Sequence, residues 1–193
     1  MLYAMCGFAN PGSVEMASAG VGSASHAAGE LFRIKAGISM VHLPCRGEAD
    51  ALGGVIAAEE RICFAGLPGA IDHIRARRLR ALGVTSAGRT DALPGIPAVA
   101  DSLPGYEAHG WFGLGAPRDT PSGIVAALNG EVNAALADPG LKSRLARLGA
   151  TPLAGSRTDF GRLVASETAR WANFIRAANA RTSATTGYRG VAA

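Results

Sequence analysis

The stretch "SAGVGSASHAAGELFRIKAGISMVHLP", residues 18–44, contains the first complete turn, helix and strand of the chain. Apolar residues recur at helical spacing from Ser23 to Lys35, which predicts an amphipathic helix. Ser23 is a suitable N-cap because its hydroxyl can accept an amide of the first turn, and Gly37 is a suitable stop. The segment "SMVHLP" then predicts a short strand that ends at Pro44.

The same alternation continues beyond this stretch. The segment "EADALGGVIAAEE" (48–60) favours a helix, "RICFAG" (61–66) a strand, "PGAIDHIRARR" (68–78) a helix and "LRALGVTS" (79–86) a third strand. Strands that alternate with helices through short links indicate βαβ units and a mainly parallel sheet, so the fold class is α/β. Right-handed crossovers then place the loops that follow the strands at one edge of the sheet.

The second half of the chain is dominated by helical patterns. A proline-containing connector (87–107) leads to an aromatic segment, "HGWFGLGAP" (109–117), which predicts a strand. Apolar stripes then predict helices over 120–137, 138–149 and 156–180, the last of which opens on a capping box from Ser156 to Asp159. We therefore expect a lobe over residues 1–105, the helical part of another lobe over 106–180, and a flexible tail over 181–193.

Composition excludes several classes of protein. The chain of 193 residues is 48% hydrophobic and 18% charged, which suits a folded core, and its net charge of +4 suits an anionic partner. Three cysteines without a CxxC pair and four scattered histidines predict no metal site. The arginine run at 75–80 lacks interleaved aromatic residues, so we expect no nucleic-acid partner. No stretch is long and apolar enough for a membrane span, and residues 1–12 do not resemble a signal peptide.

The loop before the first helix is the strongest candidate site. Its pattern G-V-G-S-A-S departs from the dinucleotide fingerprint because Ser25 stands where the third glycine belongs, so no cofactor is expected. Unpaired amides at a helix start attract a carboxylate or phosphate, and Gly20 and Gly22 allow close approach of the backbone. Ser18, Ser23, Ser25 and His26 add polar groups. The alternative is that the serines only cap the helix and the glycines only turn the chain.

Three ordered blocks of sequence resemble a known family. They are "ASAGVGSASHAAGELFRIKAGISMVHLPCRG" (17–47), "GLPGAIDHIRARRLRALGVTSAGRTDALPGIPAVAD" (66–101) and "WFGLGAPRDTPSGIVAALNGEVNAALADPGLKSRLARLGATPL" (111–153). They resemble the tripartite tricarboxylate transporter substrate-binding proteins, also called the Bug family, from about Asn10 to Ala178.

The resemblance implies a type II periplasmic-binding-protein-like fold, with one near-complete lobe and the C-terminal part of a second, incomplete lobe. It also implies that a small organic carboxylate is captured, without catalysis, for membrane transporter subunits, and that the protein works in the periplasm. The family's N-terminal portion has no counterpart here, so we expect a truncated chain of uncertain binding competence, with possible retention in the cytoplasm and self-association through the incomplete lobe. By position, the ligand-binding residues implied are Ser18, Gly20, Gly22, Ser23, Ser25, His26, Cys45, Arg46, Gly47, Ala65 and Gly66.

Two departures and two alternatives accompany this resemblance. The family has an aromatic residue where Cys45 stands and often a polar one near Ala65. One alternative is an enzyme that acts on a phosphorylated or nucleotide substrate at the Ser18–His26 loop. That enzyme would need an acid, base or nucleophile that the sequence does not visibly supply. The other alternative is a non-functional gene fragment.

Overall fold

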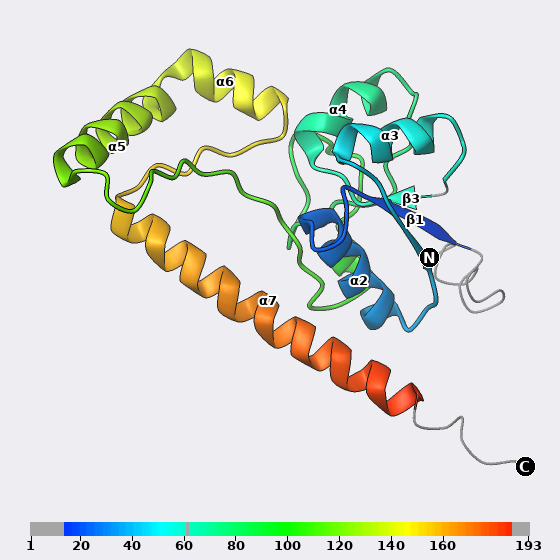
Figure 1. The fold of residues 1–193 in the computed structure, drawn as a ribbon. Helices are drawn as coiled ribbons and strands as arrows, with labels where there is room; N and C mark the ends of the chain where they lie inside the picture. Colours follow the sequence, from blue (N-terminus) through cyan, green and yellow to red (C-terminus); the bar gives the residue numbers. More distant parts are fainter. Residues whose placement is uncertain (1–13, 61, 187–193) are drawn as a thin grey trace, which may run out of the picture. The chain divides into compact units, whose positions relative to one another are not determined.

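The computed structural model describes residues 14–60 and 62–186, and side chains as far as residue 176. The chain forms two compact units: Met1–Gly115 with Asp138–Pro152, called unit 1, and Ala116–Ala137 with Leu153–Ala193, called unit 2. Unit 1 contains a small sheet with its helices, and unit 2 contains two long helices (Figure 1). The expected lobe boundaries at residues 105 and 180 stay predictions.

The sheet of unit 1 consists of three parallel strands in the order β2-β1-β3. They are β1 (Glu15–Ser18), β2 (Val41–Pro44) and β3 (Ile62–Cys63). The central strand β1 is absent from the sequence expectations, because its four residues show no run of strand-forming side chains. Met16 and Ala17 of β1 are fully buried, as expected for a parallel strand covered on both faces.

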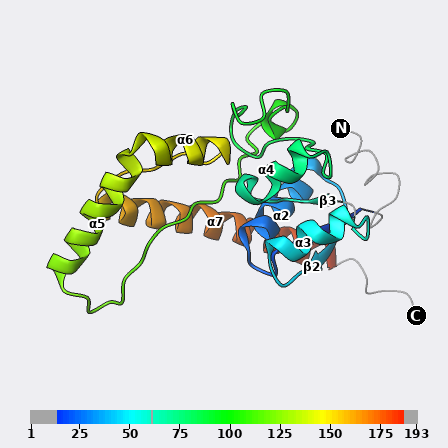
Figure 2. The ribbon, with the colours of Figure 1, turned by 90° about the horizontal axis from the view of Figure 1, so that it is seen from above.

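Helices of the crossovers cover both faces of this sheet. The chain runs from β1 through α2 (Ala24–Ala36) to β2 on one side, then through α3 (Glu48–Ile56) back across to β3 on the other. Because both crossovers are expected to be right-handed, these opposite directions place α2 and α3 on opposite faces (Figure 1). The short helix α4 (Leu67–Arg75) follows β3, and Figure 2 shows these three helices gathered around the strands.

The N-cap and the C-terminal glycine predicted for the helix in residues 18–44 are both confirmed. The Ser23 hydroxyl accepts the His26 amide at 3.2 Å, which is the predicted N-cap. Gly37 adopts a left-handed conformation with φ of 65° and ends α2. The type of each later helix is also confirmed, with ends that differ by a few residues from those expected.

Two expected strands do not form among the described residues. Val84 makes only an isolated parallel bridge with Ala98, so residues 79–86 add no full strand to the sheet. Residues 109–117 contain no strand, and Phe112 is 94% exposed. A strand needs a partner to satisfy its backbone, and these segments find none of sufficient length.

The connector after the sheet belongs to the core of unit 1. It contains one turn of 3₁₀-helix, η1 (Val99–Asp101), and ends at the buried residues Tyr106 and Ala108. The Tyr106 hydroxyl donates to the Ala28 carbonyl of α2 at 3.1 Å, and its ring meets Phe32 edge-on. The connector therefore closes the face of unit 1 that α2 covers.

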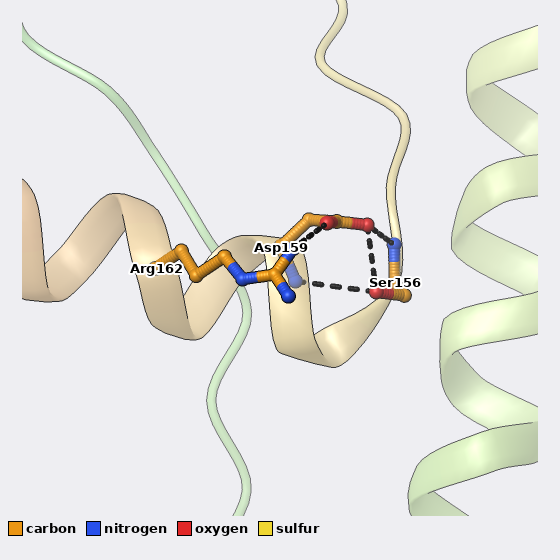
Figure 3. Close-up of polar contacts among 3 residues, drawn as sticks. All are labelled: Ser156, Asp159 and Arg162. Carbon is orange, nitrogen blue, oxygen red and sulfur yellow. Dashed lines mark hydrogen bonds and ion pairs between the residues drawn. The ribbon is translucent and has the colours of Figure 1, made fainter.

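Unit 2 contains α5 (Ser122–Ala137) and α7 (Arg157–Thr186), while α6 (Pro139–Arg147) belongs to unit 1. The side-chain amide of Asn133 donates to the Gly155 carbonyl at 3.0 Å and accepts its amide at 2.9 Å, which joins α5 to the chain just before α7. The predicted capping box is present, since Ser156 and Asp159 exchange three hydrogen bonds (Figure 3). Because α7 runs to Thr186, residues 181–186 of the expected tail are helical, and 187–193 lie outside the described residues.

Candidate anion-binding loop at the start of α2

Three loops of unit 1 follow the three parallel strands and therefore lie along the same edge of the sheet. They are residues 19–23 after β1, residues 45–47 after β2 and residues 64–66 after β3. The first two are in direct contact, because the Cys45 amide donates to the Ser18 carbonyl at 2.9 Å. This edge is where open α/β sheets bind ligands. The structure therefore gathers the predicted site residues at one edge of the sheet.

Most amides of the loop before α2 already have acceptors within the protein. The expectation of unpaired amides at the helix start therefore applies to only some residues of the loop. The Ala19 amide donates to Ser25 Oγ at 2.9 Å, Gly20 to Ser18 Oγ at 3.1 Å, Gly22 to His26 Nδ1 at 3.1 Å, Ser23 to the Gly20 carbonyl at 3.2 Å, and His26 to Ser23 Oγ at 3.2 Å.

Three amides at this helix start remain available. Within the described residues, those of Val21, Ala24 and Ser25 have no protein acceptor. Val21 is 78% exposed, and Ala24 and Ser25 are the first two residues of α2. The amides of a first helical turn carry the positive end of the helix dipole. These three amides are the available donors for an anion at this helix start, and of the three residues only Ser25 was singled out from the sequence.

The hydroxyl groups of the loop mainly organise the loop itself. Ser23 Oγ donates to the Gly20 carbonyl at 2.7 Å and lies 3.0 Å from Ser25 Oγ. Gly20 and Gly22 have φ of 117° and 80°, where a side chain is strained. The structural roles of capping and turning are thus confirmed, and any binding role of Ser23 and of the two glycines comes in addition to them.

A histidine that sequence analysis left unassigned lies under this loop. The imidazole of His42, on β2, stacks on that of His26 with ring centroids 4.0 Å apart and an interplanar angle of 13°. Its Nε2 lies 2.7 Å from Oγ of Ser18, which is fully buried. Burial, followed by the neighbouring His26, lowers the pKa of His42, while Glu30 acts in the opposite direction.

The loop after β2 contributes an exposed cation. Arg46 is exposed, and no ion pair to its guanidinium is found within the described residues. Its amide donates to Oδ2 of Asp50 in the first turn of α3 at 3.2 Å, and Gly47 is the N-cap of that helix. Burial and the nearby Glu60 raise the pKa of the Cys45 thiol, which keeps this group neutral. Cys45 therefore contributes no negative charge near the loop.

The loop after β3 is less closely connected. Ala65 is partly buried, and Gly66 is the N-cap of α4 without a side-chain capping bond. A Cβ built on Gly66 would lie 3.0 Å from the Glu48 carboxylate, so this glycine allows α3 and α4 to approach. Within the described part of the chain, no hydrogen bond joins Ala65 or Gly66 to the loop before α2. Their assignment to the site stays a prediction.

No helix in the described part of the chain combines the length and the apolar character that crossing a membrane requires. In the same residues, no group of three or more His, Cys, Asp or Glu side chains has an arrangement that could bind a metal ion.

Comparison with known proteins places these observations in a family. Residues 3–180 match the model of the tripartite tricarboxylate transporter family receptor. A UPF0065 protein from the tcbD-tcbE intergenic region of Pseudomonas sp. strain P51 is 37% identical over 86% of this chain and 50% of its own length. Protein BugT of Bordetella pertussis is 34% identical over 93% of this chain and 55% of its own. The chain thus spans about half the length of these two relatives.

Solved structures agree with this assignment. R. palustris Rpa4515 with adipate has a TM-score of 0.89 and 32% identity, covering 92% of this chain and 60% of that one. The periplasmic binding protein BugD has a TM-score of 0.86 and 27% identity, covering 92% of this chain and 60% of BugD. MatC from Rhodopseudomonas palustris with bound malate has a TM-score of 0.79 and 28% identity, covering 88% of this chain and 59% of MatC. The type II periplasmic-binding-protein-like fold is therefore confirmed, and the chain belongs to the Bug family of tripartite tricarboxylate transporter receptors.

Proposed function

We propose that this chain captures a small organic carboxylate for a tripartite tricarboxylate-type transporter, with the loop before α2 as one side of the binding site. The family consists of transporter receptors and not of enzymes. Two similar structures contain dicarboxylates, adipate in one and malate in the other. The proposal places the protein in the periplasm, where BugD works, and gives it membrane transporter subunits as partners.

The observation that carries the proposal is the set of three amides without a protein acceptor. The amides of Val21, Ala24 and Ser25 lie at the edge where ligands of open α/β sheets bind. An anion there gains charge-assisted hydrogen bonds and the favourable end of the helix dipole. The exposed Arg46 adds a positive charge on the adjoining loop.

One substitution tests the site without disturbing the fold. Ala24 is the first residue of α2, where proline is tolerated, and the preceding Ser23 has φ of −69° and ψ of 161°, which suits a residue before proline. Ala24→Pro therefore removes one proposed donor and leaves the helix in place. A hydrogen bond to a charged group contributes about 1.5–3 kcal/mol, so we expect Kd to rise on the order of tenfold to a hundredfold.

The measurement is isothermal titration calorimetry of the full chain with adipate, malate and citrate. Arg157→Pro is the matched control, because Arg157 is the first residue of α7 and also follows a capping serine. We expect Arg157→Pro to bind like the wild type. If none of the three carboxylates binds to the wild-type chain, the proposed function is wrong. If one binds and Ala24→Pro binds it equally well, the loop before α2 is not the site.

A further inference from the structure

The Ser18 hydroxyl connects the candidate loop to His42. The Gly20 amide donates to Ser18 Oγ at 3.1 Å, which leaves the hydroxyl hydrogen with two possible acceptors. These acceptors are His42 Nε2 at 2.7 Å and the Gly20 carbonyl at 3.3 Å. When Nε2 carries no proton, the hydroxyl donates to it. When Nε2 is protonated, it donates to Ser18 Oγ, and the hydroxyl turns to the Gly20 carbonyl. The same heavy-atom arrangement therefore accepts both protonation states of His42.

His26, whose ring stacks on that of His42, contacts the loop at a second position, Gly22. Its Nδ1 accepts the Gly22 amide at 3.1 Å, so Nδ1 carries no proton in this arrangement. Its ring lies 4.0 Å from that of His42. Two imidazolium ions at this separation repel each other, so the stacked pair accommodates one proton at a time. His42 is the member that can take it up without breaking a bond of the loop.

Few charged groups lie near the stacked imidazoles of His26 and His42. On α2, Glu30 favours a charged His42, but its carboxylate accepts three hydrogen bonds from the Arg33 guanidinium, at 3.1, 3.0 and 2.8 Å. On β1, the neighbouring strand, Glu15 lies opposite Val41, one residue before His42. The groups that follow β2 at the sheet edge are the neutral Cys45 thiol, the Arg46 guanidinium and the Asp50 carboxylate.

Burial, followed by the neighbouring His26, lowers the pKa of His42 below its usual 6.5, so His42 is neutral near pH 7. A carboxylate bound at the unpaired amides adds a negative charge to the loop that contacts His42 through Ser18 and His26. That charge stabilises a proton on His42 and raises its pKa.

We propose that His42 is a positioning residue of the carboxylate site: it orders the loop before α2 through Ser18 and His26, and it takes up one proton from solvent as the carboxylate binds. This inference rests on the proposed function of that loop. No covalent bond changes, since His42 Nε2 gains a proton and the Ser18 hydroxyl changes its acceptor. By linkage, affinity for the carboxylate rises as pH falls through the range between the free and bound pKa of His42, by at most tenfold per pH unit.

The first test counts protons. Calorimetry of the full chain with adipate at pH 6.5, in two buffers of different ionisation enthalpy, should show uptake of between zero and one proton per adipate. Binding at pH 6.0 should be about threefold to tenfold tighter than at pH 8.0. His42→Gln keeps a group that hydrogen-bonds to Ser18 but does not titrate, so it should bind adipate with no uptake by the protein and a flat profile. Any proton that adipate itself exchanges appears equally in both proteins and cancels in the comparison.

The matched control is His109→Gln. His109 follows the connector, and its Nδ1 lies 3.4 Å from Oε1 of Glu107. It should reproduce the wild-type pH profile and proton uptake. Equal proton uptake in wild type and His42→Gln, or adipate binding by the wild type without any uptake, overturns the proton linkage.

A second test needs no ligand and separates this inference from the proposed function. In NMR spectra of the free chain, the amide resonance of Gly20, whose acceptor is Ser18 Oγ, should titrate together with the His42 imidazole, and His42→Gln should abolish that titration. A Gly20 amide resonance that does not titrate with His42 overturns the positioning role of His42. If no carboxylate binds at any pH, the proposed function and the proton linkage both fail, and the Gly20 titration alone then decides whether His42 orders the loop.

Discussion

Unit 1 buries its apolar side chains, whereas unit 2 leaves many of its own exposed. Every buried residue among residues 14–176 lies between Val14 and Ala108, in unit 1. In unit 2, Ile124 and Leu128 of the α5 stripe are each 53% exposed, and Ile175 of α7 is 52% exposed. The same kind of amphipathic pattern therefore has different outcomes. It produces a core only where a second apolar layer lies against it.

The largest effect expected from this comparison is on core stability. Ile71 of α4 is fully buried and Ile124 of α5 is half exposed, so one substitution can be made in both units. Ile71→Ala should lower the free energy of unfolding by about 2–5 kcal/mol, because it removes buried methyl groups and leaves a cavity. Measured at a concentration where the chain is monomeric, Ile124→Ala should cost about 1 kcal/mol or less. Urea unfolding followed by circular dichroism measures both, and equal costs would mean that Ile124 is covered in solution.

The exposed stripe of unit 2 also predicts self-association of the chain. Burying a leucine side chain fully contributes about 1.5–3 kcal/mol, so two copies gain by pairing their α5 stripes. Leu128→Glu should therefore shift the chain toward monomer in sedimentation velocity. Ala126→Glu is the control, because it adds the same charge to α5 at an exposed position about 200° away around the helix. A wild-type chain that sediments as a monomer at all concentrations contradicts the prediction.

Two helical glycines should respond to alanine with opposite signs. A Cβ on Gly29 of α2 would overlap Met16 Sδ and lie 2.8 Å from Met16 Cε, both in the core of unit 1. Overpacking costs about 1–3 kcal/mol, which outweighs the gain of about 1 kcal/mol in helix propensity. A Cβ on Gly130 of α5 would meet no atom within 4 Å, so only the gain remains. Thermal unfolding should show that Gly29→Ala destabilises the chain and Gly130→Ala stabilises it. If Gly29→Ala left the thermal stability unchanged, the side chains between α2 and β1 would be loosely packed.

The sequence predicts helices well where their ends are marked by local chemistry. Ser23, Ser156 and Gly37 act within one turn of their own positions, so their roles could be predicted without knowledge of the fold. Strands depend on a partner that can lie far along the chain. The strand β1 was missed and residues 109–117 were wrongly predicted to form a strand, because pairing decides both cases.

The sequence could predict where the candidate site lies in the fold, but not which hydrogen bonds its residues form. Alternating strands and helices place the loops after β1, β2 and β3 at one edge, whatever their sequences. Which amides remain unpaired depends on side-chain orientation, since Ser25 Oγ and His26 Nδ1 each accept one amide of the loop. His42 was not predicted because its contact with Ser18 requires the pairing of β1 with β2.

The smallest expected effect lies at the start of α7 and depends on pH. The hydrogen bonds from Ser156 to the Asp159 carboxylate, followed by the charge of Arg162, lower the pKa of that carboxyl below its ordinary 3.8. A carboxyl whose pKa is lower in the folded state stabilises that state fully above the unfolded value. The contribution is lost as pH falls through the folded value. Asp159→Asn should therefore destabilise α7 at pH 5 and have little effect near pH 2.

This pH dependence should affect the two units differently, because the capping box drawn in Figure 3 belongs to unit 2 alone. Amide hydrogen exchange can follow α7 separately from the sheet of unit 1. At pH 5, Asp159→Asn should speed exchange in the first turns of α7 and leave β1 unchanged. Ser156→Ala should reproduce that change, at a cost of about 0.5–1 kcal/mol for a lost cap. If exchange in β1 changes by the same factor, the two units unfold together, and the contrast between a buried and an exposed half does not extend to their stability.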